Sequence, residues 1–367
     1  ALNVPLFVGE TGENSNFWYR DAVKVFEENG IGWAWWPFKR IGAIQPPMSI
    51  SYNEKYNKIV DYWNGGGEAP SKEDAIEGLR QLTEDIKFEN TRYQKDVIDA
   101  LFRQPFSDET IPYAENIIPG KIFASDFDLG IMGEAYYDAG SEANYGGDFS
   151  AWNNGWAYRN DNVDIQNNED PQSNGYNVGW IESDEWMQYT LKDPTSGLYN
   201  IKVRVATEDN DGSFYLKIND NQVTDLINVP NTESWTNWSF INIDSLVVYD
   251  TDDKFVFQVK TGTFNLGFFE FERIGDINLL QTKYISSFTL SENSININFN
   301  KNLDNTSILN KSDFLLNIND QEKDIQNVNY SSSPRSIIIN FDTEIQPTDI
   351  VTLSYTGNSV RACLLYT

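Results

Sequence analysis

The hydrophobic pattern of the chain changes its period near residue 119, and this change limits the fold more than any other feature. Before residue 104, short apolar runs alternate with stretches in which apolar residues recur every three or four positions, as in β/α units. Beyond Pro119, many short runs of alternating polarity are separated by Asn, Asp and Gly, as in β-sandwiches. Because single cores rarely grow beyond about 250–300 residues, a chain of 367 residues is expected to hold more than one domain.

The first 108 residues are predicted to contain strands and helices in alternation. Buried strands are expected at Val4–Gly9 and Ile31–Trp36, with a helix at Phe17–Asn29 between them. Two amphipathic helices are expected at Tyr52–Trp63 and Glu73–Phe102. A strand–helix–strand order of this kind is typical of parallel β/α folds.

The remainder of the chain is predicted to be a linker and two β domains. Residues 109–118 lie in a proline-containing stretch and are expected to be the linker, followed by a sandwich at 119–274 and a smaller one at 278–361. The runs that carry this expectation are Tyr199–Ala206, Ser213–Ile218, Lys254–Lys260, Ser294–Phe299, Ser336–Phe341 and Ile350–Tyr355.

Charge and residue counts exclude several classes of function. The formal net charge of −28 would repel nucleic acids and anionic membranes. The chain has no histidine, so any acid–base chemistry must use carboxyl groups. Cys363 is the single cysteine, which excludes an intrachain disulfide and a cysteine zinc site. No apolar run is long enough to cross a membrane. We therefore expect a monomer without cofactors.

Aromatic residues point to a neutral, ring-shaped ligand. The chain holds 11 Trp and 19 Tyr, and flat amphipathic rings stack on the apolar faces of sugars. Ordinary core packing is the competing explanation for most of them. The sequence favours a polysaccharide partner such as β-glucan, cellulose or xylan.

A carboxylate and a tryptophan follow the two predicted parallel strands. Glu10 comes directly after the first strand, and Trp36 ends the second, three residues before Lys39. Barrel enzymes present catalytic groups at these strand ends, and sugar hydrolysis needs carboxyl groups beside the sugar. The alternative is an exposed strand-end glutamate near core tryptophans.

These two segments resemble the seventh and eighth strands of family 5 glycoside hydrolases, the cellulase family. The resemblance covers about the first 100 residues and implies that Glu10 is the nucleophile. It also implies that Trp36 lies at the cleavage subsite and that Lys39 lines the cleft. Glu13 ranks below Glu10 because it does not follow the strand directly.

The resemblance implies an incomplete catalytic site in this chain. Family 5 enzymes use a second glutamate, near the end of the fourth strand, as the general acid/base, and retaining hydrolysis needs two carboxyl groups about 5–5.5 Å apart. We therefore expect this chain alone to be inactive, and residues 1–108 to fold poorly without the missing barrel strands.

Residues 119–273 resemble family 6 carbohydrate-binding modules. The similarity follows five segments in the order and spacing of that family: Asn177–Thr190, Val203–Thr207, Val229–Thr232, the region of Trp235 and Trp238, and Gly262–Leu266. The resemblance implies a β-sandwich of the jelly-roll type that clamps one sugar between two aromatic rings.

By position, Trp180 and Trp235 are the clamp, and Asn265 is the amide that bonds sugar hydroxyls. Core packing of either ring and a turn role for Asn265 are the alternatives. Trp186 and Trp238 are better core candidates than Trp180 and Trp235. Family members often hold a structural calcium ion, whose usual ligands are replaced here by Ser125 and Gly267. Candidate calcium ligands remain nearby in the sequence at Asp126, Glu270 and Glu272, but we expect no metal.

Residues 278–361 resemble bacterial immunoglobulin-like domains, without paired carboxylates or an aromatic cluster, so we expect a spacer. Arg361–Thr367 does not continue the strand pattern, and we expect an artificial or frame-shifted end. Together the resemblances imply a multidomain chain: the C-terminal end of a partial (β/α)8 barrel, a jelly-roll β-sandwich and an immunoglobulin-like β-sandwich.

The expected function is polysaccharide degradation outside the cell. We interpret the chain as the C-terminal part of a secreted, retaining endo-β-glucanase with an appended binding module. The alternatives are a non-catalytic carbohydrate-binding protein with an inert barrel remnant, and a cell-surface adhesin. The sequence does not distinguish among glycans that share the same apolar ring faces.

Overall fold

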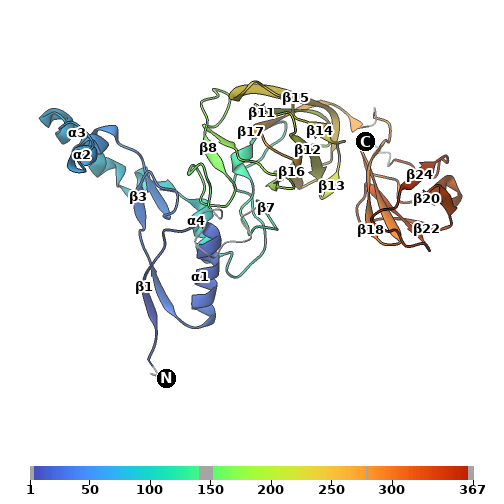
Figure 1. The fold of residues 1–367 in the computed structure, drawn as a ribbon, viewed down its shortest axis with the longest axis horizontal. Coiled ribbons are helices and arrows are strands. Elements are labelled where there is room, and N and C mark those ends of the chain that lie inside the picture. The colour runs from blue at the N-terminus through green and yellow to red at the C-terminus, as the bar shows by residue number, and fades with distance from the viewer. Residues whose placement is uncertain (1–3, 140–151, 278–279, 363–367) are drawn as a thin grey trace. The chain divides into compact units, whose positions relative to one another are not determined.

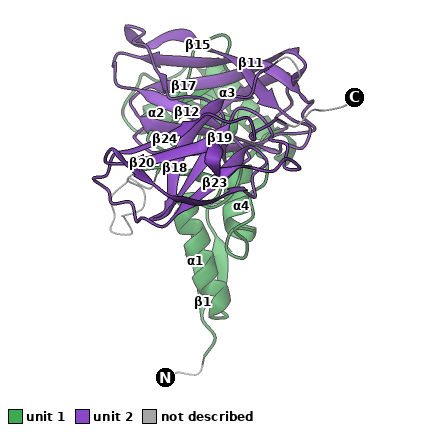
Figure 2. Ribbon diagram, turned by 90° about the vertical axis from the view of Figure 1, so that its right-hand side faces the viewer, with its two compact units in different colours: residues 1–114, 125–181 green, residues 115–124, 182–367 purple. Residues whose placement is uncertain are grey.

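The computed structural model describes residues 4–139, 152–277 and 280–362, and these are mostly β-strand with a few helices (Figure 1). They form two compact units, residues 1–114 with 125–181, and residues 115–124 with 182–367 (Figure 2). This division falls within residues 119–274, so the expected domain boundaries stay a prediction. The terminal segment from Cys363 onward, where we expect an artificial end, lies outside the described residues.

The first unit holds all four α-helices of the described residues and several short strands. Its helices are α1 (Asn16–Glu28), α2 (Glu54–Trp63), α3 (Lys72–Asp85) and α4 (Lys95–Phe102). Its strands are β1 (Phe7–Thr11), β2 (Gly32–Trp35), β3 (Lys39–Ile41), β4 (Met48–Ile50), β5 (Arg92–Tyr93), β7 (Tyr136–Tyr137), β8 (Ile165–Asn167) and β9 (Tyr176–Val178). β1 and β2 are parallel, β3–β4–β5 form a small mixed sheet, and β8–β9 form an antiparallel hairpin.

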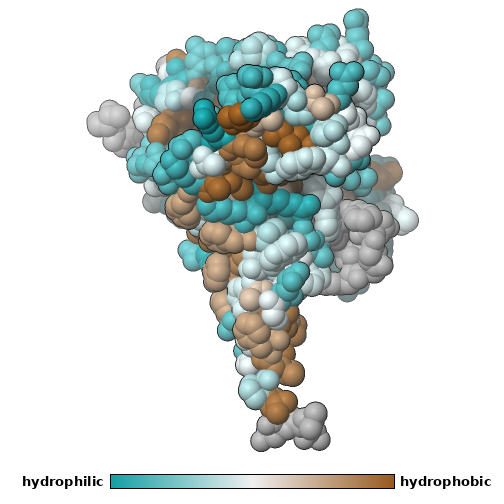
Figure 3. Space-filling model, turned by 90° about the vertical axis from the view of Figure 1, so that its left-hand side faces the viewer, coloured by the Kyte–Doolittle hydropathy of each residue, from teal (hydrophilic) through white to brown (hydrophobic). Residues whose placement is uncertain are grey.

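The first predicted strand is displaced and exposed. It begins at Phe7 rather than Val4, and Phe7 is 66% exposed, because β1 pairs with β2 alone among the described residues. Figure 3 shows apolar side chains gathered on the narrow arm that ends near the N-terminus. A parallel pair normally lies inside a larger sheet. The prediction of a buried strand is therefore wrong for these residues.

The predicted helix Glu73–Phe102 is two helices. α3 ends at Asp85, a 3-10 turn follows at Phe88–Asn90, and β5 intervenes before α4. Arg92 and Tyr93 pair with β4, so sheet pairing overrides the helical periodicity there. Gly78 lets α3 approach α2, since a Cβ atom at this position would lie 2.8 Å from the Lys55 backbone carbon.

A buried polar network joins α1 and α4 to the segment before β8. The carboxylate of Asp96, in the first turn of α4, accepts hydrogen bonds from Asn16 Nδ2 (2.8 Å) and from the Asn160 backbone N–H (2.7 Å). Asn16 Nδ2 also donates to Asp161 (2.9 Å), which pairs with the fully buried Arg159 (2.6 Å). Burial, and then the nearby charge of Asp161, raise the pKa of Asp96 to about 6.

This raised pKa predicts a loss of stability as the pH rises. A carboxyl group whose pKa is higher in the folded state favours folding when protonated, so its contribution is fully present below its ordinary pKa and is lost as the pH rises through about 6. Asp96→Asn, which is neutral at every pH, should flatten this decline. Thermal melting of both proteins from about pH 4 to about pH 8 measures it. Parallel curves for the two proteins would refute the assignment.

The second unit contains a β-sandwich built from two antiparallel sheets. One sheet has the order β15–β11–β17–β6, and the other has β10–β16–β12, with β13 and β14 pairing β12. The strands are β6 (Gly120–Phe123), β10 (Trp186–Thr190), β11 (Gly197–Thr207), β12 (Ser213–Ile218), β13 (Asn221–Gln222), β14 (Ile227–Asn228), β15 (Ser234–Val248), β16 (Lys254–Thr261) and β17 (Asn265–Gly275).

Aromatic rings fill the space between these two sheets. Phe255 of β16 packs edge-on against Phe269 of β17, with ring centres 4.9 Å apart, and Tyr189 of β10 lies 5.6 Å from Phe269. Phe257 and Phe264 are fully buried beside them. The alternating pattern in β11 and β16 predicted this core, because successive strand residues face opposite sides.

The C-terminal β domain also has two facing sheets. Four strands form one sheet, β18 (Tyr284–Ser291), β19 (Ser294–Phe299), β23 (Ser336–Phe341) and β22 (Ile325–Tyr330). Three form the other, β21 (Gln321–Lys323), β20 (Phe314–Ile318) and β24 (Val351–Tyr355). Leu316, Ile337 and Ile339 are fully buried between them. The immunoglobulin-like assignment and the spacer role stay predictions.

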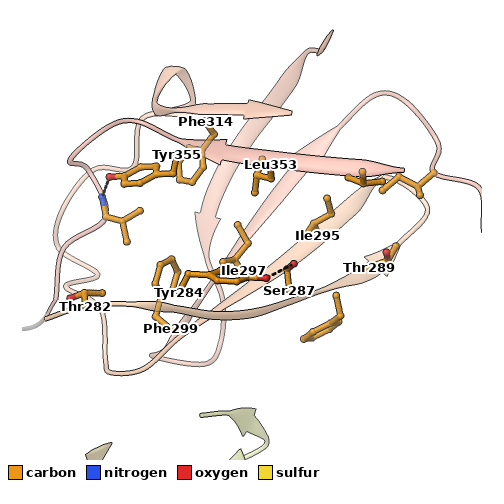
Figure 4. Close-up of a pocket in the computed structure, with 14 residues that line it drawn as sticks. Thr282, Tyr284, Ser287, Thr289, Ile295, Ile297, Phe299, Phe314, Leu353 and Tyr355 are labelled. Carbon is orange, nitrogen blue, oxygen red and sulfur yellow. Dashed lines mark hydrogen bonds between the residues drawn. The ribbon is translucent and has the colours of Figure 1, made fainter. Parts of the chain in front are cut away.

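A hollow of about 590 Å³ opens between edge strands β18 and β24 of this domain (Figure 4). Tyr284, Phe299, Phe314 and Tyr355 contribute to its lining, and the last two rings lie 4.8 Å apart. The sequence analysis expected no aromatic cluster here. Tyr284 and Phe299 come from the paired neighbours β18 and β19, whereas Phe314 and Tyr355 come from β20 and β24 in the other sheet. The sequence therefore did not indicate that these rings line one hollow.

A buried ion pair connects the C-terminal domain to the sandwich. Arg335 is 1% exposed, and its guanidinium donates to Asp252 Oδ2 (2.6 Å) and to the carbonyl of Val247 (3.2 Å). Burial raises the pKa of Asp252 and lowers the pKa of Arg335, so the loss of hydration outweighs the attraction between the two charges. Such a pair gives specificity to the junction more than stability.

We predict that Arg335→Ala destabilises this unit by about 3–5 kcal/mol, because it leaves the Asp252 carboxylate buried without its partner. Chemical denaturation measures the free energy of unfolding. The control Lys192→Ala removes a solvent-exposed ion pair with Glu115 and should change stability little. Equal effects of the two substitutions would contradict the prediction.

Candidate carbohydrate-binding site

The ends of β11, β15 and β17 meet at one end of the sandwich. Thr207 of β11 lies opposite Ser234 of β15, and Ala206 lies opposite Asn265 of β17. This register brings the predicted residues Trp235 and Asn265 together. The buried Asn265 donates a hydrogen bond from Nδ2 to the carbonyl of Trp235 (2.8 Å).

A hydrogen-bonded turn holds Trp235 at the surface. The Thr232 hydroxyl donates to the Thr207 carbonyl (3.0 Å) and accepts from the Thr207 N–H (2.8 Å). Asn237 Nδ2 donates to the Thr232 carbonyl (2.6 Å). Glu233 has a φ of 72°, an uncommon value for a residue other than glycine. Trp235 remains 36% exposed on this ordered support.

Trp180, the other predicted clamp residue, lies in the first unit just after β9. Its side chain is 51% exposed, whereas Val178 and Ile181 on either side are buried. Gly179 N–H donates to the Asp164 carbonyl (2.9 Å), and Trp180 has a φ of 48°. The core-packing alternative is therefore excluded for this ring. Because Trp180 and Trp235 belong to different units, their pairing stays a prediction.

Trp186 and Trp238, the expected core tryptophans, are only half-buried. Trp238 lies beside Gly267, where an added Cβ atom would come within 3.3 Å of its ring. The core of this sandwich consists of phenylalanine and tyrosine rings instead. Both are nonetheless more buried than Trp180 and Trp235, so the expectation that they are the better core candidates of the four is confirmed.

Three of the residues considered for calcium have protein partners. Ser125 accepts a hydrogen bond from Asn174 Nδ2 (3.0 Å), and Asp126 accepts one from the Tyr158 hydroxyl (2.6 Å). Glu270 forms an ion pair with Lys202 (3.6 Å). Among the described residues, no three Asp, Glu or Cys side chains lie close enough to hold a metal ion. No helix of these residues is both long and apolar enough to span a membrane.

Glu10 lies inside β1, one residue before its carboxyl end, rather than directly after the strand as expected, and Trp36 directly follows the parallel strand β2. Phe7 pairs with Gly32, and the Trp36 N–H donates to the Thr11 carbonyl (2.9 Å). Glu10 is exposed, and Trp36 is 52% exposed. The geometry places both side chains at one sheet edge, while their catalytic roles stay predictions.

Lys39 and Glu13 have partners that the sequence did not indicate. Lys39 Nζ donates to the Ile86 carbonyl (2.7 Å), beyond the end of α3, and lies 5.7 Å from the Phe88 ring centre. Glu13 pairs with Arg40. The Lys39 ammonium group is therefore hydrogen-bonded just beyond the end of α3, and its predicted role in lining a cleft stays a prediction.

Comparison with known proteins identifies the class of the sandwich. Residues 157–273 match the family described as "Carbohydrate binding module (family 6)". This match supports a family 6 carbohydrate-binding module in this part of the chain. It covers residues 157–273 of the expected 119–273 and does not extend to residues 1–156 or 274–367. No curated protein matches the chain.

Solved structures of family 6 modules are also similar to this chain. A module of Cellvibrio mixtus lichenase 5A, in complex with cellotriose, is 24% identical, covers 30% of this chain and 87% of its own, and has a TM-score of 0.28. The C-terminal module of a marine laminarinase from Zobellia galactanivorans is 26% identical over 30% and 88%, with a TM-score of 0.28. A β-1,3-glucan-binding module from Bacillus halodurans is 17% identical over 43% and 99%, with a TM-score of 0.31.

We predict that Thr232→Val loosens the Trp235 support. The substitution keeps the side-chain shape but removes the hydroxyl that bonds both Thr207 backbone groups, so unfolding should become easier by about 1–3 kcal/mol. Denaturation gives the stability, and amide hydrogen exchange near Trp235 reports the local effect. The control Thr236→Val changes an exposed threonine on the same strand. Unchanged exchange in Thr232→Val would contradict the proposed support.

Proposed function

We propose that this chain holds a β-glucan or a related plant polysaccharide through Trp180, Trp235 and Asn265. The observation that carries the proposal is the contact between Asn265 and Trp235 at the end of the family 6 sandwich. Trp235 presents an exposed ring. Trp180 supplies a second exposed ring.

The physical basis of binding is ring stacking combined with hydrogen bonds. A pyranose ring has an apolar C–H face that stacks on an indole, and its hydroxyls project from the rim. Trp180 itself has a positive φ, and so does Glu233, two residues before Trp235. Uncommon backbone conformations of this kind concentrate at ligand sites. This combination favours a neutral polysaccharide over a charged ligand.

Affinity electrophoresis tests the clamp. One glucan or xylan in the gel should retard the wild-type chain, and Trp180→Ala and Trp235→Ala should each abolish the retardation, since each removes one stacking ring. Trp63→Ala, an exposed tryptophan of α2, serves as the control and should behave as wild type. Retardation that survives both clamp substitutions would exclude the assignment, and no retardation by any polymer would exclude the proposed ligand class.

We also propose that residues 1–108 are the C-terminal part of a secreted, retaining endo-β-glucanase of the cellulase type. The support is the placement of Glu10 and Trp36 near the ends of adjacent parallel strands, with apolar residues such as Phe7 exposed for lack of neighbouring strands. The module would keep the enzyme on its polymer, because tethering turns later encounters into intramolecular ones. A non-catalytic carbohydrate-binding protein is the second candidate, and the module match supports it equally well.

The two candidates differ in the role of Glu10. If a longer chain that supplies the remaining barrel strands hydrolyses β-glucan, Glu10→Gln should reduce the rate by several orders of magnitude, because it removes the nucleophile. Glu13→Gln, just beyond the end of β1, is the matched control and should retain activity. Reducing-sugar release measures both. Full activity of Glu10→Gln in an active longer chain would refute the nucleophile assignment, and an inactive longer chain would favour the non-catalytic protein.

A further inference from the structure

Trp152 and Trp156 form an aromatic pair outside the predicted clamp. Their rings meet edge to face, with centres 4.9 Å apart and planes at 67°. Trp152 is half-buried, whereas Trp156 is 47% exposed, nearly as much as Trp180. The pair therefore presents a large indole to solvent with a second indole behind it.

A buried asparagine fixes the loop that carries this pair. Asn153 is 2% exposed, and its side chain makes four hydrogen bonds. Its Nδ2 donates to the carbonyls of Ala157 (2.8 Å) and Arg159 (2.9 Å). Its Oδ1 accepts from the N–H groups of Gly155 (3.0 Å) and Ile165 (2.8 Å). One side chain thus replaces the backbone pairing that this irregular segment lacks.

The backbone at Trp156 is held in an uncommon conformation. Its φ is 49°, a region that few residues other than glycine adopt. Gly155 packs so tightly that an added Cβ atom would lie 2.0 Å from the Ile165 carbonyl oxygen. Asn154 donates two hydrogen bonds to the Asp164 carboxylate, one from its backbone N–H (2.6 Å) and one from its Nδ2 (2.8 Å). Strain that the surroundings maintain in this way is characteristic of ligand sites.

An exposed tryptophan by itself is common on protein surfaces. Trp63, which is 67% exposed on α2, shows the difference, because it lies at the end of a regular helix. Trp156 combines a positive φ, a supporting ring and a hydrogen-bonded loop, and it directly precedes the module match, which begins at residue 157. A polymer held by the module offers further sugar faces, which suit a stacking ring.

We propose that Trp156, backed by Trp152, is a second stacking platform for the polysaccharide, separate from the Trp180–Trp235 clamp. This inference rests on the proposed carbohydrate function. A short oligosaccharide fills the clamp alone, whereas a polymer contacts both sites at once. The second contact then adds affinity through its high effective concentration.

The experiment compares a polymer with a trisaccharide of the same glycan. Affinity electrophoresis over a series of polymer concentrations gives the dissociation constant for the polymer, and calorimetry gives that for the trisaccharide. Trp156→Ala should weaken polymer binding by about three- to tenfold, which corresponds to loss of one aromatic contact. Its trisaccharide affinity should equal that of the wild type. Trp156→Phe, which keeps a ring, should retain most of the polymer affinity.

Several outcomes would overturn this inference. Equal polymer affinity of Trp156→Ala and wild type would refute the platform, as would an equal loss in the control Trp63→Ala. A parallel loss of trisaccharide affinity would place Trp156 in the clamp instead, and a lowered melting temperature in both Trp156 variants would make the role structural. In each case, loss of binding in Trp180→Ala and Trp235→Ala would leave the proposed function intact. Failure of the wild type to bind any polymer would remove both.

Discussion

The binding end of this protein depends on the aromatic layer between the two sheets of the sandwich. Phe255, Phe257 and Phe269 pack β16 against β17. β17 begins at Asn265, and β11 lies between β17 and β15, whose second residue is Trp235. The core therefore positions the strands, and the Asn265–Trp235 hydrogen bond and the Thr232 turn position the two site residues on them. A rigid core that presents polar and aromatic groups at strand ends is a common way to build a binding site.

Buried polar groups organise the junctions of the chain. Arg335 meets Asp252 between the sandwich and the C-terminal domain, and Arg159 meets Asp161 beside Asp96 in the first unit. Both arginines are buried, so loss of the acidic partner would leave an unpaired buried charge and destabilise the fold. The segment around the expected linker is tied in as well, since Lys95 Nζ donates to the Tyr113 carbonyl (3.0 Å) and Ile118 is buried.

The sequence predicted the strands of the sandwich and the smaller β domain well, because period-two alternation with turn residues is a strong local signal. Ser213–Ile218, Ser294–Phe299 and Ser336–Phe341 appear with the expected bounds. It failed at Glu73–Phe102, where pairing of Arg92 with β4 breaks a helical pattern. Such pairing is a long-range interaction that no local window contains.

The sequence likewise indicated some of the candidate site residues and not others. Trp235 and Asn265 could be named from segment order, but the Thr232 support and the Asn153 loop could not, since their roles arise from hydrogen bonds to distant backbone groups. The engagement of Lys39 with the end of α3 was equally hidden. Residue type and spacing indicate which aromatic rings could stack on a sugar. Three-dimensional contacts determine which of these rings are held exposed in a fixed conformation.

The most direct test of the central claim is a crystal structure of this chain with a short oligosaccharide of the glycan that it binds. The account predicts one sugar ring stacked between Trp180 and Trp235, with a hydroxyl hydrogen-bonded to Asn265. A sugar bound elsewhere on the sandwich, with either tryptophan remote from it, would contradict the account.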